Sequence, residues 1–78
     1  MPHFFFHVFN DEITLDEEGA DFPDLASARA EGLRAARGLA AASVVEHGHL
    51  VLSHRIDVVS TDGRVAQVFF REAVDVRA

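Results

Sequence analysis

A chain of 78 residues with 49% hydrophobic and 26% charged residues has the composition of one small globular domain and is too apolar for intrinsic disorder. Its 13 acidic and 7 basic residues give a net charge of −6, which repels phosphate backbones and argues against direct binding to DNA or RNA. The absence of cysteine excludes disulfides and thiolate metal sites, so we expect a partner subunit to supply the stability that so short a chain otherwise lacks.

The N-terminal segment MPHFFFHVFN is dense in aromatic residues. It has no cationic region, no long apolar run and no small-residue cleavage site, so we expect neither a signal peptide nor a membrane span, and a cytoplasmic location. Its composition predicts a strand over His3–Phe9 that is apolar on both faces. Alternation separates two sets of side chains, Phe4, Phe6 and Val8 on one face and Phe5, His7 and Phe9 on the other.

Turn-forming residues at 10–12 end this strand, and residues 13–15 can return beside it as a hairpin. The acidic stretch DEEG at 16–19 reads as a second turn. Pro23 is then expected at the first helical position, where its missing N–H costs nothing, with Asp21 and Asp24 near the positive end of the helix dipole.

A helix is predicted from Leu25 to the EHGH segment at 46–49, where Gly48 can adopt the left-handed cap conformation. Steps of 100° gather mostly small residues on one face of this helix. They are Leu25, Ala28, Gly32, Ala36, Leu39 and Ser43, with Leu33 and Ala40 at the edge. Such a face can lie close against a sheet that supplies the bulky side chains.

The last third, HRIDVVSTDGRVAQVFF, predicts a hairpin around residues 61–63. A two-residue Asp-Gly turn would oppose polar to apolar side chains, whereas a three-residue loop with a type I turn and a glycine bulge matches them. The expected pairs are Ile56 with Val68, Asp57 with Gln67, and Val58 with Ala66. Residues 72–78 read as a short tail or a brief edge segment.

The expected fold is therefore a single α+β domain over residues 1–78, with the order ββαββ and one helix on one face of a small, mainly antiparallel four-stranded sheet. The face of the sheet opposite the helix is apolar and would be exposed to water in a monomer. Its residues are Phe5, His7, Phe9, Val59, Val65 and Phe69. We predict homodimerisation through this face or through a strand edge; the alternative is that the tail or a bent sheet covers it within one chain.

Several short motifs occur in a fixed order along nearly the whole chain: Met1-Pro2, an aromatic-Phe-His strand at 5–7, the acidic turn at 16–19, Pro-Asp-Leu at 23–25, the Ala/Arg/Glu helix and Asp-Gly-Arg at 62–64. In this the chain resembles an uncharacterised family of short bacterial proteins, a domain of unknown function with no assigned activity. The resemblance therefore implies no catalytic residues.

A weaker resemblance is to the small domains of HicB-type antitoxins, in which a Pro-Asp-Leu-like turn also leads into an alanine-rich helix. It implies a small protein partner and, in many cases, dimerisation. The present chain lacks an appended DNA-binding segment.

Metal or small-ligand binding is a further alternative. Seven carboxylates lie within segment 11–24, and His47, His49 and His54 lie close together in the sequence. The acidic segment lacks the residue order of an EF-hand loop, and the histidines lack an evident fourth ligand or rigid support, so we assign no metal site. No serine shows a nucleophile-elbow pattern and no glycine-rich phosphate loop is present. We therefore predict a protein without catalytic activity and without a cofactor.

Overall fold

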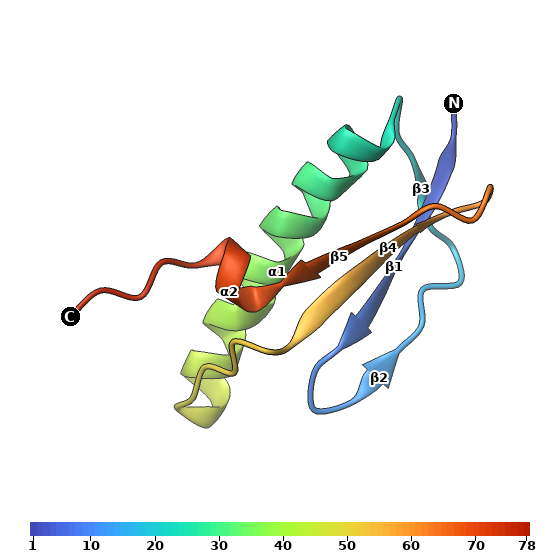
Figure 1. Cartoon of the computed structure of the whole chain (residues 1–78). Coiled ribbons are helices and arrows are strands. Elements are labelled where there is room, and N and C mark those ends of the chain that lie inside the picture. The colour runs from blue at the N-terminus through green and yellow to red at the C-terminus, as the bar shows by residue number, and fades with distance from the viewer.

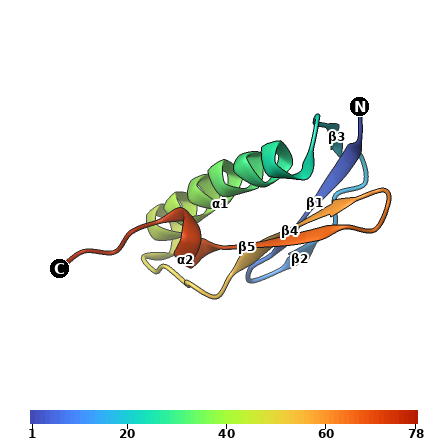
Figure 2. The same ribbon diagram turned by 45° about the horizontal axis from the view of Figure 1, so that its top comes forward.

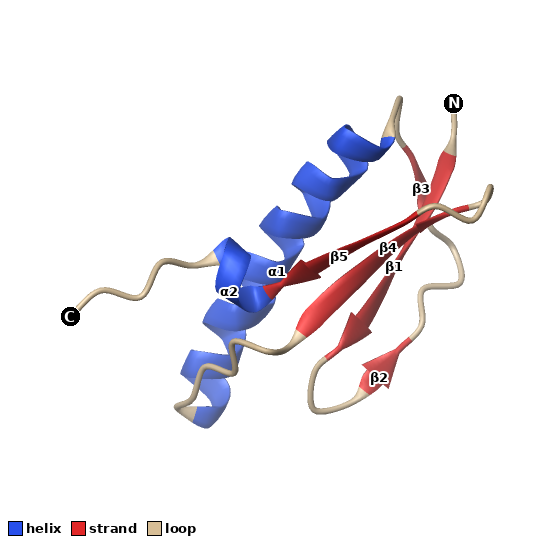
Figure 3. Ribbon diagram, viewed as in Figure 1, coloured by secondary structure: helices blue, strands red, loops and turns tan.

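The computed structural model describes residues 1–78 and contains five strands and two helices (Figures 1 and 3). In chain order they are β1 (His3–Phe9), β2 (Ile13–Thr14), β3 (Ala20–Asp21), α1 (Leu25–His47), β4 (Arg55–Ser60), β5 (Val65–Phe69) and α2 (Phe70–Ala73). The strands form one antiparallel sheet in the order β2-β1-β4-β5, with β3 also paired to β1. The predicted α+β class is confirmed, and β3 is an addition to the expected strands.

The hairpin of β4 and β5 has the register predicted from side-chain polarity. Asp57 pairs with Gln67, and the flanking pairs are Ile56 with Val68 and Val58 with Ala66. The loop has three residues, because Ser60 donates its N–H to the carbonyl of Arg64. Gly63 has a φ of 91°, the left-handed conformation that a glycine bulge requires.

The entrance to α1 differs from the expectation for Pro23 by two positions, because the first helical residue is Leu25. Asp24 is the N-cap, and its carboxylate accepts a hydrogen bond from the N–H of Ser27. Pro23 therefore precedes the cap and does not occupy the first helical position, because an aspartate caps a helix better than it continues one. At the other end, Gly48 adopts the predicted left-handed cap, and its N–H bonds to the carbonyl of Val44.

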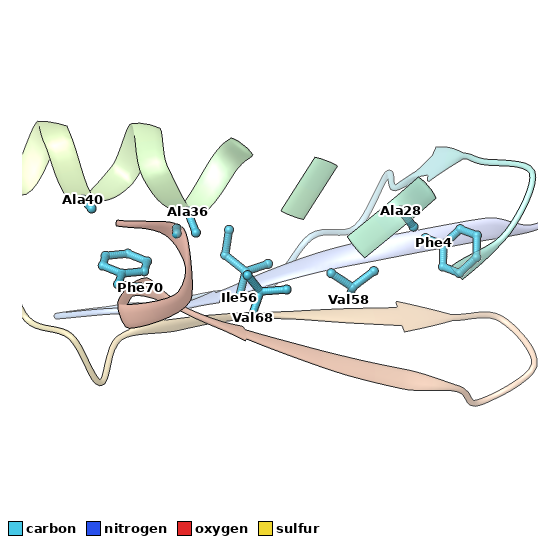
Figure 4. Packing of buried hydrophobic residues seen from close by; sticks show 9 residues of the cluster. Phe4, Ala28, Ala36, Ala40, Ile56, Val58, Val68 and Phe70 are labelled. Carbon is cyan, nitrogen blue, oxygen red and sulfur yellow. The ribbon is translucent and has the colours of Figure 1, made fainter. Parts of the chain in front are cut away.

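The core lies between α1 and one face of the sheet (Figure 4). The helix contributes small buried residues at i, i+4 spacing, Ala28, Gly32, Ala36 and Ala40, so Ala40 belongs to the centre of the buried stripe and not to its edge. The sheet contributes the bulk, Phe4, Ile56, Val58 and Val68, all at most 1% exposed. A Cβ on Gly32 would lie 3.0 Å from Cγ2 of Val58, so the helix approaches the sheet closely at this point.

The sequence predicts a short tail or a brief edge segment for residues 72–78, and this prediction is wrong for residues 72 and 73. Phe70–Ala73 form the one-turn helix α2, and Phe70 and Ala73 are buried in the core. Arg37 of α1 donates to the carbonyl of Ala73, which holds the turn against the long helix. Both helices thus cover the same face of the sheet, and the opposite face carries no helix (Figure 2).

Candidate interaction face

The sheet face opposite the helices is referred to below as the free face. The antiparallel registers arrange its side chains in three rows across the strands. The first row is Phe5, Val59 and Val65, the second is His7, Asp57 and Gln67, and the third is Ile13, Phe9, Arg55 and Phe69. An apolar row and a row with three apolar members thus flank a polar centre.

All six residues predicted for an interface lie on this face, and none of them belongs to the buried core. Phe5, Phe9, Val59 and Phe69 are half-buried by their neighbours within the sheet, and Val65 is 54% exposed. Ile13, which sequence analysis did not include, is 69% exposed and pairs with Phe9. The face therefore presents apolar side chains to solvent on both sides of its polar centre.

The aromatic rings of β1 form a ladder along the free face. The ring of Phe5 makes an edge contact with His3, at 5.1 Å between centroids, and stacks in parallel on His7 at 6.2 Å. Nδ1 of His7 accepts a hydrogen bond from the N–H of Asp16, at 3.0 Å. A nitrogen that accepts carries no proton, so the neutral ring of His7 holds its proton on Nε2, available as a donor.

The charges of the free face are paired. Nε of Arg55 lies 2.9 Å from Oδ1 of Asp57, and the guanidinium carbon of Arg55 lies 4.2 Å from the ring centroid of Phe9. Since one positive charge offsets one negative charge, the centre of this face is neutral in a chain of net charge −6. Sequence analysis missed Arg55 and Asp57 as interface residues, although their alternation with Ile56 and Val58 already placed them on this face.

The acidic segment does not form a cation cage, because its central carboxylate is used by the backbone. Oδ2 of Asp16 accepts from the N–H of Phe6, and Oδ1 accepts from the N–H groups of Glu18 and Gly19. Burial raises the pKa of Asp16, but these three N–H donors outweigh it, so the pKa lies below its ordinary value of 3.8. Between β2 and β3 no strand pairs with this edge of β1, and the carboxylate of Asp16 takes the place of the absent strand by accepting the N–H of Phe6.

His3 fastens β3 to β1. Its Nδ1 lies 2.7 Å from Oδ1 of Asp21, and its Nε2 lies 2.6 Å from the carbonyl oxygen of Glu18. Both partners are acceptors, which favours a ring protonated on both nitrogens. The hydrogen bond to Asp21, followed by that to Glu18, accordingly raises the pKa of His3 above 6.5.

The three histidines of the alternative metal site lie at the C-terminal end of α1. His47 and His49 stack at 5.4 Å, whereas His54 contacts the edge of Phe70. The 23-residue helix is about 34 Å long and the 7-residue β1 about 24 Å, so the helix overhangs the sheet. A notch of about 190 Å³ lies in this region, and Asp11, Glu46, His47 and His54 are among its lining residues.

Asp11 lies between two of these histidines, 3.7 Å from Nε2 of His54 and 4.0 Å from Nε2 of His49. No three histidine, aspartate or glutamate side chains in the structure gather in an arrangement that could hold a metal ion. The geometry thus gives the metal-binding alternative no support, either in the notch or in segment 11–24.

Residues 3–71 match the family described as Domain of unknown function (DUF6894). The chain belongs to this family. The resemblance to an uncharacterised family inferred from the motifs is thereby confirmed. No curated protein and no solved structure matches the chain. No helix of this DUF6894 domain combines the length and apolar character needed to cross a bilayer.

Proposed function

We propose that this DUF6894 domain is a non-enzymatic assembly module that associates with a second copy of itself through the free face. One observation carries the proposal: both helices pack on the same side of the sheet, and the other side presents half-buried aromatic rings and exposed aliphatic side chains to water. Apolar side chains exposed together on one face of a sheet are typical of a contact site.

Charge favours a second copy as the occupant. A net charge of −6 opposes the approach of two identical chains, and the opposition is smallest where the surface is neutral. The free face meets this condition because Arg55 and Asp57 neutralise each other at its centre. The carboxylates of the acidic turn lie at the edge of β1 instead, where Asp16 bonds to the backbone.

The proposal is tested by sedimentation equilibrium on the chain and on three lysine variants, two on the free face and one control on α1. Val59 is on the free face in the central strand β4, and the control residue Val45 is on α1 and 85% exposed. Val59→Lys places a charge in the contact, so we expect at least a tenfold rise in the dimer dissociation constant, whereas Val45→Lys leaves it unchanged.

Ile13→Lys is the second free-face variant, because an exposed side chain at the edge of the sheet can change without cost to the fold. It should weaken the dimer several-fold. Far-UV circular dichroism checks that each variant is folded. A dimer that all three lysine variants leave equally stable would exclude the free face, and a monomer at every concentration would exclude self-association.

The HicB-like alternative remains a prediction, and no feature of the structure favours it over self-association.

A further inference from the structure

We infer that the two copies pack face to face about a two-fold axis parallel to the strands, above the boundary between β1 and β4. This inference rests on the proposed function and adds the geometry of the dimer. In this arrangement β1 of one copy lies against β4 of the other, and β2 lies against β5. The registers of the sheet then determine which side chains meet.

The polar middle row becomes self-complementary. His7 and Asp57 are cross-strand neighbours, so exchanging β1 with β4 sets each His7 against Asp57 of the partner subunit. Since Asp16 occupies Nδ1 of His7, the proton of the neutral ring is on Nε2 and points to a carboxylate acceptor across the interface. Arg55 engages only Oδ1 of Asp57, which leaves the other carboxylate oxygen for this bond.

Each outer row brings one pair of apolar side chains together. Phe5 meets Val59 of the partner subunit, and Ile13 meets Phe69 of the partner subunit. The guanidinium of Arg55, already above the ring of Phe9, is set against the partner's Phe9 as well. Each Arg55 guanidinium is thus enclosed by a carboxylate and two aromatic rings.

A two-fold axis perpendicular to the strands gives a worse match. It would set Asp57 against Asp57 of the partner subunit and would put Arg55 against the partner's Val59. Like charges would then meet, and Arg55 would keep the ring of its own Phe9 but lack the partner's Phe9, so the match is poorer. The charge pattern of the free face therefore selects the axis parallel to the strands.

The size of the face predicts a weak dimer. The three longer strands, β1, β4 and β5, have 7, 6 and 5 residues. At about 4.8 Å spacing and about 20 Å mean length they cover about 300 Å² in projection, and the accessible area of so corrugated a surface is larger. Stable interfaces bury about 800 Å² per partner. The free face is smaller than this, so we expect the dimer to dissociate on dilution.

Cross-linking tests this geometry on a cysteine-free background. Facing sheets lie about 10 Å apart, too far for a disulfide, so the probe is a short bis-maleimide. Ile13→Cys and Phe69→Cys chains, mixed in equal amounts, should give a covalent dimer. Either variant alone should not, because β2 and β5 are three strand spacings apart, which puts identical residues of the two copies about 17 Å from each other.

The other geometries give different products. A perpendicular axis would cross-link Val65→Cys with Phe69→Cys, and edge pairing of two β5 strands would cross-link Gln67→Cys with itself. Either product, in place of the mixed one, would overturn the inferred axis while leaving self-association intact. Loss of every product together with a monomeric mass would instead refute the proposed function.

The unaltered chain provides the same test without substitution. In a dimer prepared from differently isotope-labelled copies, nuclear Overhauser contacts between the Ile13 methyl groups and the Phe69 ring should cross the interface. Intermolecular contacts that join Val65 to Phe69 would contradict the axis.

Discussion

At the scale of single residues, polar side chains in this small domain replace backbone partners that the sheet lacks. Asp16 accepts the N–H of Phe6, which neither β2 nor β3 reaches, together with two N–H groups of its own turn, and His3 joins β3 to β1. Sequence analysis placed Asp16 in a solvated turn, because nothing in the residue order indicates that a carboxylate will fold back on a strand ten residues away. Such long-range side-chain contacts to the backbone follow from topology and not from local pattern.

Ionisable side chains make the stability of the fold depend on pH in two ways, one lost as the pH rises and the other lost as the pH falls. The pKa of His3 is raised, so its contribution is fully present below the ordinary value of 6.5 and is lost as the pH rises through the folded value. The pKa values of Asp16, Asp24 and Asp62 are lowered, so their contributions are present above 3.8 and are lost as the pH falls through the folded values.

His3→Gln is expected to destabilise the fold at about pH 5.5 and to have a much smaller effect at about pH 9, because only the protonated ring donates from both nitrogens. Urea unfolding of both chains at the two pH values measures the difference. Asp21→Asn removes the carboxylate partner and should diminish the same pH dependence. If the difference in unfolding free energy between the unaltered chain and His3→Gln is the same at both pH values, the protonated ring of His3 does not hold β3 to β1.

At the scale of elements, the patterns with long or matched periods and the hairpin strand β2 were predictable, whereas β3 and α2 were not. The register of β4 and β5 followed from opposing polar to polar residues, and α1 followed from its stripe of small residues and its glycine cap. The two-residue β3 and the one-turn α2 have too few residues for any period. Their positions come from tertiary contacts, since Phe70 packs beneath α1.

The two glycines inside α1 provide a matched test of how closely the helix approaches the sheet. A Cβ on Gly38 meets nothing within 4 Å, so Gly38→Ala should stabilise the fold by about 0.5–1 kcal/mol through helix propensity. Gly32→Ala would press on Val58 and Val68, which are fully buried, and should destabilise by about 1 kcal/mol or more. Thermal unfolding of both variants measures these changes in stability. Equal stabilisation by both would show that α1 is not closely packed on the sheet at Gly32.

At the scale of the whole molecule, one helix layer covers one side of a sheet that is apolar on both sides. Strand alternation in the sequence already placed Phe5, His7 and Phe9 opposite the helix, and the structure adds the ion pair of Arg55 and Asp57 at the centre of that face. The pairing of these charges was not predictable, because it depends on side-chain directions within the sheet. Together these features make the free face both apolar and neutral in an acidic protein.

The most direct measurement is a dilution series of amide NMR spectra on the unaltered chain. Association through the free face predicts concentration-dependent shifts that cluster on β1, β4 and β5, with little change on the outer surface of α1. It also predicts a rotational correlation time that rises toward that of a particle of twice 8.6 kDa. Spectra that do not change with concentration, with the correlation time of an 8.6 kDa monomer throughout, would contradict the account.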